Sequence, residues 1–348
     1  MSATTVNGLT ILDFDFSSVS GNLQNGTQDG FSLDYNGTVV QFLSYEGSLT
    51  ASNGPASGVT SNDVGVRETS STPSGHSLQL AGIGDAYNDF KWQEAAADTD
   101  GAFNNNQKIV STSTALTIAS GESFSIYNTV QVASLNNSGT LTIVGDDSGY
   151  GQLKVTGTIS NSGTIIQQQY IPSTGHHAIS SSMTAGFTTT SGSASKLYAY
   201  NSATGAYNTS PNTTGAGTGY FAPVQASNGF ISSEGSFTVT GTPNTSHTWS
   251  LGSASNQATG GSGSGWNLIG NPYTASLDWT TVDLTGKDIN NAIYLWDADN
   301  ESYDYYVSGV SAPSGTYAGS AISNPNIAPL QAFWVQTTAS GQTLATTM

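Results

Sequence analysis

The sequence predicts an almost entirely β protein, because its composition favours strands and tight turns over helices. Gly accounts for 41 of the 348 residues, and Ser, Thr and Asn are also plentiful. Gly and Asn tolerate the positive φ angles of tight turns, and Thr and aromatic residues favour strands. We expect three segments: a β-sandwich or jelly roll over 1–108, a short β-solenoid-like repeat over 109–172 and a β-sandwich-like module over 173–348.

Charge is sparse and mostly negative, which excludes some partners. Six Lys and Arg stand against 23 Asp and Glu, giving a net charge of −17, and no cysteine is present. Nonspecific affinity for nucleic acid depends on Lys and Arg, so no nucleic-acid partner is expected. No apolar run of about 18 residues occurs, so no membrane insertion is expected. The first five residues also lack the features of a signal peptide. If the protein is exported, we therefore expect this sequence to be a mature fragment.

The first segment contains a strong hairpin pattern. Apolar and polar residues alternate across 31–42 (FSLDYNGTVVQF), on both sides of Asn36 and Gly37. This dipeptide is typical of the two-residue turns that join antiparallel strands. Further short strands are expected near 64–66, 77–80 and 89–92.

The second segment contains a repeat. The motif 137–143 (NSGTLTI) recurs at 161–166 (NSGTII), and 115–118 (ALTI) lies a similar distance upstream. A period of about 24 residues suits one coil of a parallel β-solenoid. A meander of hairpins is the competing interpretation. A stack this short would need neighbouring segments to cover its ends.

Three aromatic blocks mark the third segment, at 265–273 (GWNLIGNPY), 291–297 (NAIYLWD) and 327–335 (IAPLQAFWV). Period-two alternation of their apolar residues predicts strands with a buried face, and Gly270-Asn271-Pro272 predicts a turn between them. The Ser/Thr/Gly stretches at 184–195 and 252–265 are expected to be linkers or long surface loops.

These blocks resemble a module of secreted surface proteins of Bacteroidota that are exported by type IX secretion. In those proteins the module usually precedes the C-terminal sorting domain. The resemblance implies a location outside the cell or on the outer-membrane surface. It does not imply a reaction.

No catalytic constellation is evident. The four histidines, His76, His176, His177 and His247, show no metal-ligand spacing of the kind found on zinc-binding helices. No nucleophile elbow occurs, and nothing in the sequence pairs two carboxylates for glycoside hydrolysis. We therefore predict that the protein is not an enzyme.

An acidic turn at 297–304 (DADNESYD) is a candidate calcium site. Ca²⁺ prefers six to eight oxygen ligands, and Asp297, Asp299, Glu301 and Asp304 place four carboxylates in one turn. The pattern begins like an EF-hand loop but lacks the turn glycine and the acid at the twelfth position. A solvated hairpin without metal is the alternative.

Aromatic residues near this turn are candidates for binding a glycan or another partner. Sugar rings stack on exposed aromatic faces, and neighbouring residues on a strand point to opposite faces. At least one tyrosine of 303–306 (YDYY) should therefore be exposed. The candidates are Trp92, Trp296, Tyr303, Tyr305 and Tyr306.

The leading hypothesis is a non-enzymatic extracellular surface protein, part of an adhesin, a fibre or a stalk that could self-associate with other copies. The alternative is a glycan-binding accessory region of a larger secreted enzyme, with the first segment as the lectin-like module.

Overall fold

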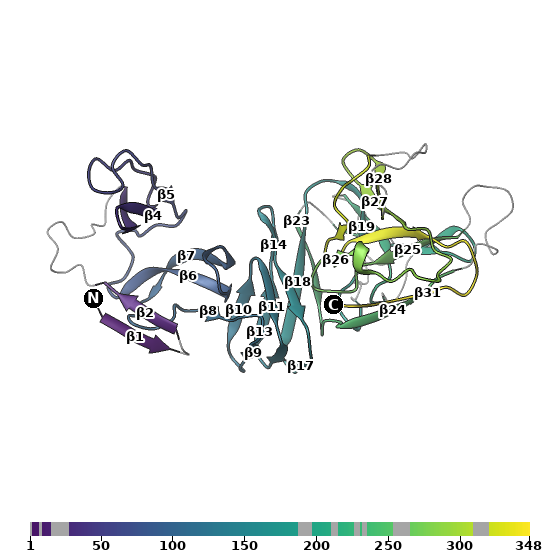
Figure 1. The fold of residues 1–348 in the computed structure, drawn as a ribbon, viewed down its shortest axis with the longest axis horizontal. Helices are drawn as coiled ribbons and strands as arrows, with labels where there is room; N and C mark the ends of the chain where they lie inside the picture. The colour runs from purple at the N-terminus through teal and green to yellow at the C-terminus, as the bar shows by residue number, and fades with distance from the viewer. Residues whose placement is uncertain are drawn as a thin grey trace. The chain divides into compact units, whose positions relative to one another are not determined.

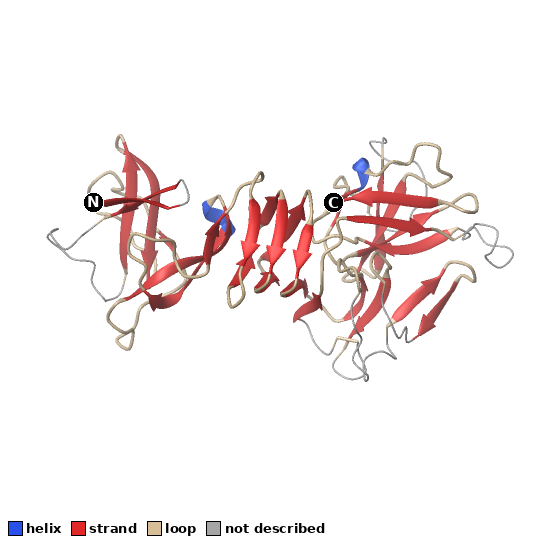
Figure 2. Cartoon of the chain, turned by 90° about the horizontal axis from the view of Figure 1, so that it is seen from below, coloured by secondary structure: helices blue, strands red, loops and turns tan. Residues whose placement is uncertain are grey.

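The computed structural model describes residues 2–6, 9–14, 28–186, 197–209, 215–225, 230–231, 235–252, 265–308 and 320–348. Strands and short 3₁₀-helical turns make up the regular structure of these ranges (Figure 2), which confirms the predicted all-β class. None of the helical turns in these ranges is long and apolar enough to cross a membrane. The expected linkers at 184–195 and 252–265 fall almost entirely outside the described residues.

The chain forms two compact units, Met1–Ile109 and Val110–Met348. The first coincides closely with the segment expected over 1–108. The second contains both the repeat and the aromatic module, which the sequence separates at residue 172. Each unit is described on its own below.

Three small sheets build the first unit (Figure 1). Their elements are β1 (Ser2–Val6), β2 (Leu9–Asp13), β3 (Asp29–Tyr35), β4 (Thr38–Tyr45), β5 (Asn62–Asp63), β6 (His76–Gly84), the 3₁₀ turn η1 (Tyr87–Asp89), β7 (Phe90–Ala97) and β8 (Gln107–Ile109). The sheet orders are β1-β2, β3-β4-β5 and β7-β6-β8. The expected hairpin is confirmed, because β3 and β4 pair antiparallel around Asn36 and Gly37, which adopt φ angles of 52° and 76°.

Buried residues of the first unit gather on β4 and β6. Leu43 and Ile83 are buried apolar anchors, and Gln79 is a buried polar residue whose hydrogen bonds are satisfied. The Gln79 side chain donates to the Ala97 carbonyl at 2.8 Å and accepts from the Asn105 backbone N–H at 2.9 Å. A buried amide that is hydrogen-bonded at both ends can fix the position of the segment around Asn105 without a desolvation penalty.

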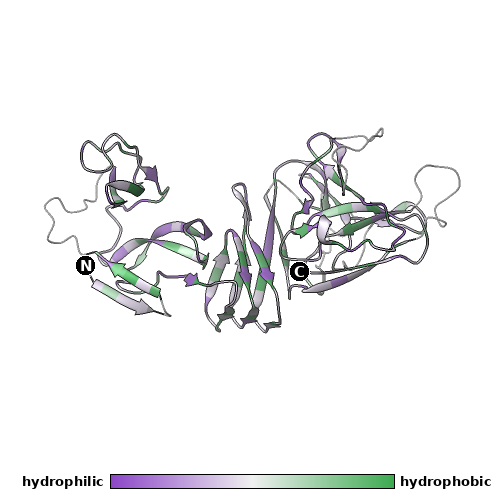
Figure 3. Ribbon diagram, viewed as in Figure 1, coloured by the Kyte–Doolittle hydropathy of each residue, from purple (hydrophilic) through white to green (hydrophobic). Residues whose placement is uncertain are grey.

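A parallel β-solenoid with three faces opens the second unit, which confirms the predicted repeat. Its first sheet is β9 (Ala115–Ile118), β12 (Ser134–Asn137) and β17 (Ile159–Asn161), its second is β10 (Ser123–Ile126), β13 (Thr140–Ile143) and β18 (Thr164–Ile171), and its third is β11 (Thr129–Val132) and β16 (Gln152–Val155). Hydrophobic and hydrophilic residues alternate along these strands (Figure 3), so every second side chain can point inward.

Stacked side chains and close backbone contacts hold the coils together. Phe124, Leu141 and Ile165 occupy equivalent positions of successive coils and are buried. At one corner Ser138 and Ser162 stack with their hydroxyl oxygens 3.1 Å apart. The adjacent corner position must be glycine, because a Cβ on Gly163 would collide with the backbone of the coil below.

The coils are unequal in length, which corrects the alignment of the first repeat. Ala115–Ile118 pairs with Ser134–Asn137 and not with the 140–143 motif that it resembles. That motif pairs instead with Ser123–Ile126. The predicted period of about 24 residues holds between the second and third coils, where Leu135 pairs with Ile159, whereas the paired residues Leu116 and Leu135 of the first two coils lie closer in the sequence. Part of the difference comes from a hairpin, β14 (Gly145–Asp146) and β15 (Gly149–Tyr150), inserted in the second coil.

Two four-stranded antiparallel sheets form the C-terminal module, in line with the sandwich-like prediction. The first is β19 (Gly175–Ile179), β22 (Tyr220–Val224), β20 (Tyr198–Asn201) and β21 (Ala206–Thr209), and the second is β25 (Trp266–Gly270), β30 (Ala332–Gln336), β27 (Ala292–Asp297) and β28 (Ser302–Val307). The remaining elements are β23 (Gly235–Thr240), β24 (Ser246–Ser250), β26 (Leu277–Asp278), the 3₁₀ turn η4 (Trp279–Thr281), β29 (Asn326–Ile327) and β31 (Thr343–Thr347). Of these, β23 pairs antiparallel with β18 and so joins the module to the last coil of the solenoid.

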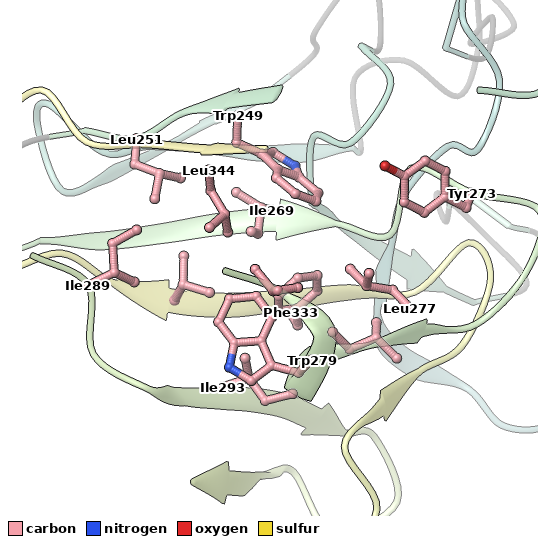
Figure 4. Close-up of a cluster of buried hydrophobic side chains, with 13 residues drawn as sticks. Trp249, Leu251, Ile269, Tyr273, Leu277, Trp279, Ile289, Ile293, Phe333 and Leu344 are labelled. Carbon is pink, nitrogen blue, oxygen red and sulfur yellow. The ribbon is translucent and has the colours of Figure 1, made fainter. Parts of the chain in front are cut away.

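The sheet β25-β30-β27-β28 buries both faces. One face carries Ile269, Ile293 and Phe333, which pack with Trp249 and Trp279 into the main core of the module (Figure 4). The opposite face packs against the other four-stranded sheet through an aromatic cluster. This second, aromatic layer is where the candidate site lies.

Candidate ligand-binding pocket

A pocket of about 320 Å³ lies in the aromatic layer of the C-terminal module. The described residues that line it are all aromatic: Tyr200, Trp266, Tyr294, Tyr303 and Trp334. Four of these are half-buried, and Trp334 is 8% exposed. We call these five residues the aromatic cage.

Strand pairing explains why four of the five rings share one face of a sheet. Tyr294 lies opposite Trp334 on the neighbouring strand, and Trp266 and Trp334 belong to strands β25 and β30, which pair in register. Tyr294 and Tyr303 lie on the paired strands β27 and β28. Since alternate residues of a strand point to the same face, these side chains meet opposite the main core. Tyr200 reaches them from β20 of the facing sheet.

The rings of the aromatic cage stand nearly perpendicular to one another. The planes of Trp266 and Trp334 meet at 88° with ring centroids 6.2 Å apart, and those of Trp334 and Tyr200 meet at 78° with centroids 4.7 Å apart. Trp266 and Tyr294 make an angle of 75° at 5.1 Å. Edge-to-face pairs are a favoured arrangement of aromatic rings. The result is a pocket with ring walls on several sides.

Polar groups contribute little to the pocket. The indole nitrogen of Trp334 is buried and has no hydrogen-bond partner of standard geometry among the described residues. Burial raises the pKa of the Tyr303 hydroxyl, and the nearby Trp334 indole offsets part of that rise. Burial also raises the pKa of Tyr207, which packs edge-on against Tyr200. These tyrosines therefore stay neutral at ordinary pH, and the described lining of the pocket carries no charged side chain.

The structure brings together only part of the set proposed for a glycan or partner. Trp296 and Tyr303 pack at a ring-centroid distance of 4.9 Å, and Trp296 donates its indole N–H to the His176 carbonyl at 2.7 Å. Tyr305 is on the same face but only 8% exposed, and Tyr306 packs on the opposite face against the main core.

Trp92 belongs to the first unit, on β7, and is not among the residues that line the aromatic cage. Its indole N–H donates to the Tyr87 hydroxyl at 2.9 Å.

The acidic turn is organised by its own hydrogen bonds. The Asp297 carboxylate accepts from the Asp299 backbone N–H at 3.0 Å, the Asn300 backbone N–H at 3.2 Å and the Asn300 side-chain amide at 2.6 Å. Hydrogen bonds from Asn300 lower the Asp297 pKa. Asp304 accepts from the Ser320 backbone N–H at 3.0 Å, and Glu301 has a φ of 47°. Across the described ranges, no three His, Asp or Glu residues gather closely enough to hold a metal ion.

Histidines of the C-terminal module lie outside the aromatic cage. The His177 ring nitrogen Nε2 is 2.9 Å from the Ser173 carbonyl oxygen, and burial lowers the pKa of His177. His247 packs edge-on against Trp249 at 4.9 Å, and burial lowers its pKa as well. His176 lies beside Tyr198, with ring centroids 6.1 Å apart.

Sequence reasoning missed four of the five residues of the aromatic cage. Trp266, Tyr294 and Trp334 lie in the aromatic blocks from which strands with a buried face were predicted, and Tyr200 was not singled out. The signal that could have found Tyr294 is its spacing of two from Trp296, which puts both on one face of a strand. Bringing Trp266 and Trp334 beside it required the strand order, which periodicity alone does not supply.

Comparison with family models, curated proteins and solved structures finds no match to this chain. The inference about function therefore depends on the fold and the pocket. Together they define an all-β protein with a solenoid, a sandwich-like module and a pocket whose described lining is aromatic. Such a pocket can bind a ligand by stacking and burial.

Proposed function

We propose that this chain is a non-enzymatic binding segment of an extracellular surface protein of the adhesin type. The aromatic cage is the observation that carries the proposal. Ligand pockets are mostly apolar and concave, with volumes of about 300 to 1,000 Å³, and the pocket of about 320 Å³ is within this range. The low charge and the resemblance of the aromatic blocks to secreted surface proteins support the extracellular assignment.

Ligand binding is tested with the full chain on an array of glycans, cell-surface polymers and immobilised small head groups. We expect selective retention by a few members of the array. Tyr303→Ala should abolish that retention, because it removes one wall of the aromatic cage. Tyr150→Ala is the matched control, since Tyr150 is a 44% exposed tyrosine on the solenoid hairpin. Retention that survives Tyr303→Ala, or no selective retention, would overturn the proposal.

Location is tested separately on intact cells that produce the full-length protein. We expect an antibody against this segment to label unpermeabilised cells, and external protease to remove the label. A segment that becomes accessible only after lysis would contradict the extracellular assignment.

The array of glycans, polymers and head groups also tests the alternative function, a glycan-binding accessory region. In that case retention on the array would depend on Trp92 of the first unit.

Self-association into a fibre is a second candidate function, favoured by strand β3. This strand lies at the edge of its described sheet, and Phe31, Leu33 and Tyr35 are exposed on it by 43%, 52% and 73%. An apolar edge strand can template pairing with another chain. Sedimentation velocity of the full chain should then show assembly that increases with concentration. Leu33→Lys should suppress it, and assembly equal to that of the unaltered chain would count against this role.

A further inference from the structure

We propose that the aromatic cage binds a quaternary ammonium group, such as the trimethylammonium head of a choline compound. This inference builds on the proposed function, which requires only that the pocket bind some ligand. Its support comes from the ring arrangement, from the small number of polar groups in the described lining and from the charge around the pocket.

Ring arrangement is the first argument. A cation is attracted to the face of an aromatic ring, most strongly to Trp, and a quaternary ammonium group can contact several faces at once. Trp266 and Trp334 form perpendicular walls, and Tyr200, Tyr294 and Tyr303 complete the lining. Nearly perpendicular walls suit a compact tetrahedral group, whereas one flat platform would suit a sugar ring.

The second argument is that the described lining of the pocket offers few polar groups, namely ring hydroxyls and indole N–H groups. A sugar or a primary ammonium group that enters the pocket must exchange its water hydrogen bonds for protein ones, and burying an unpaired polar group is costly. Among the described lining residues the polar groups are tyrosine hydroxyls and indole N–H groups, with no carboxylate, amide side chain or imidazole. A trimethylammonium group has no N–H donor to satisfy, so it can be buried here without that penalty.

Charge is the third argument. The second unit carries 11 Asp and Glu against three Lys, and neither Lys154 nor Lys287, the two that the structure describes, lines the pocket. Asp297, Asp299 and Glu301 lie at the turn between β27 and β28, the strands that carry Tyr294 and Tyr303. Hydrogen bonds lower the Asp297 pKa and so keep its carboxylate ionised at neutral pH. A cationic ligand is thus attracted toward this end of the sheet, and added salt should weaken the attraction.

Pocket size limits the ligand further. A volume of about 320 Å³ lies at the lower end of the range for small-molecule sites. It accommodates a head group and its first carbons, while the rest of a longer ligand would remain outside.

The decisive experiment compares choline with its neutral isostere 3,3-dimethylbutan-1-ol on the unaltered full chain. Both have the same shape, but only choline is charged. Calorimetry and tryptophan fluorescence should give at least about tenfold tighter binding of choline, equivalent to ~1.4 kcal/mol. Equal or tighter binding of the isostere would overturn the inference, because the pocket would then be merely apolar. Tighter binding of methyl glucoside would overturn it in favour of a sugar site.

Substitutions in the aromatic cage provide a second measurement. Trp266→Leu should weaken choline binding about tenfold and leave the isostere almost unaffected, while Trp266→Phe should retain part of the affinity. Tyr150→Leu is the control outside the pocket. Circular dichroism monitors folding, and the comparison of the two ligands on the unaltered chain does not depend on any variant. Equal weakening of choline and the isostere would argue against a cation site.

Three further ligands identify the source of the ammonium group. Phosphocholine, glycine betaine and a peptide with trimethyl-lysine share the head but differ in the attached group, and the tightest of them names the source. If an uncharged array ligand binds through Tyr303 while none of the ammonium compounds binds, the proposed function stands and this inference fails. If nothing binds through the aromatic cage, both fail.

Discussion

Leu153 and Thr274 exchange two hydrogen bonds where the solenoid meets the C-terminal module. The Leu153 backbone N–H donates to the Thr274 carbonyl at 3.0 Å, and the Thr274 hydroxyl donates to the Leu153 carbonyl at 2.6 Å. Leu153 lies on β16, the last strand of the third solenoid face, so Thr274 occupies the place of a missing third strand. An edge of the solenoid that would need a cap is covered by the following module, which explains why both belong to one compact unit.

Removing the Thr274 hydroxyl should destabilise this junction. Thr274 is fully buried, and Thr274→Val keeps its shape while leaving the Leu153 carbonyl without that partner. We expect a loss of roughly 1–3 kcal/mol in the free energy of unfolding, measured by denaturant titration. Thr129→Val, at an exposed threonine of the solenoid, should change it by less than about 0.5 kcal/mol. Similar effects of the two substitutions would contradict the capping role.

Tight stacking at the solenoid corner makes a second prediction. In Gly163→Ala the new methyl group meets the Gly139 carbonyl and neighbouring backbone, which cannot move aside as a side chain can. The free energy of unfolding should fall by roughly 1–3 kcal/mol. Ser160→Ala, at an exposed position of β17, should cost less than about 0.5 kcal/mol. If Gly163→Ala lowers the free energy of unfolding no more than the control substitution does, the corner is not close-packed.

The partial burial of His247 predicts acid sensitivity. Because burial lowers its pKa in the folded protein, the unfolded chain binds a proton more readily. Neutral His247 therefore contributes fully to the stability of the folded protein above the ordinary pKa of 6.5. This contribution is lost as pH falls through the lower pKa that His247 has in the folded protein. Unfolding free energies at pH 7.5, 6.5 and 5.5 should decrease in that order.

A matched substitution isolates this histidine. His247→Gln removes the titrating group, so the decrease between pH 7.5 and pH 5.5 should become smaller. His177 is still present in this variant, and burial lowers its pKa as well. Part of the decrease in unfolding free energy at low pH should therefore remain. An unchanged pH dependence in His247→Gln would exclude His247 as a source.

Calcium binding at the acidic turn remains a prediction with a direct test. A cation held by Asp297, Asp299, Glu301 and Asp304 should raise the melting temperature when calcium is added, and a chelator should reverse the rise. Binding must compete with the three hydrogen bonds that the Asp297 carboxylate already accepts. Asp297→Asn should reduce any calcium-dependent rise, because it removes one ligand charge. If neither calcium nor the chelator changes the melting temperature, the acidic turn does not bind calcium.

The solenoid was predictable because its signal is local. The recurring Asn-Ser-Gly-Thr motif places a tight corner and an inward-pointing strand in each coil, and these are properties of a few adjacent residues. The first coil was misaligned because 115–118 and 140–143 share the same alternation, which any inward-pointing strand would show. Distinguishing them required the pairing of Leu116 with Leu135, a contact between coils.

The candidate site was only partly predictable because it depends on long-range pairing. Trp296 and Tyr303 stand out in one hairpin, and their proximity follows from the hairpin alone. Tyr200 and Trp334 are far apart in the sequence, yet their ring centroids lie 4.7 Å apart. Alternation also could not decide what each face of 303–306 packs against: Tyr306 is partly buried against the main core, and Tyr303 lies on the opposite face in the aromatic cage.

The unequal coils of the solenoid have a practical consequence. Equivalent residues of the first two coils lie closer in the sequence on the second face, from Phe124 to Leu141, than on the third face, from Val130 to Leu153. The inserted residues 145–150 account for the difference, and a hydrogen bond of 2.6 Å from the Gly151 N–H to the Val144 carbonyl closes the insertion at its base. The coil thus carries this hairpin without a change in its own stacking. A foreign peptide spliced into the hairpin tip would be displayed on a rigid scaffold that it does not disturb.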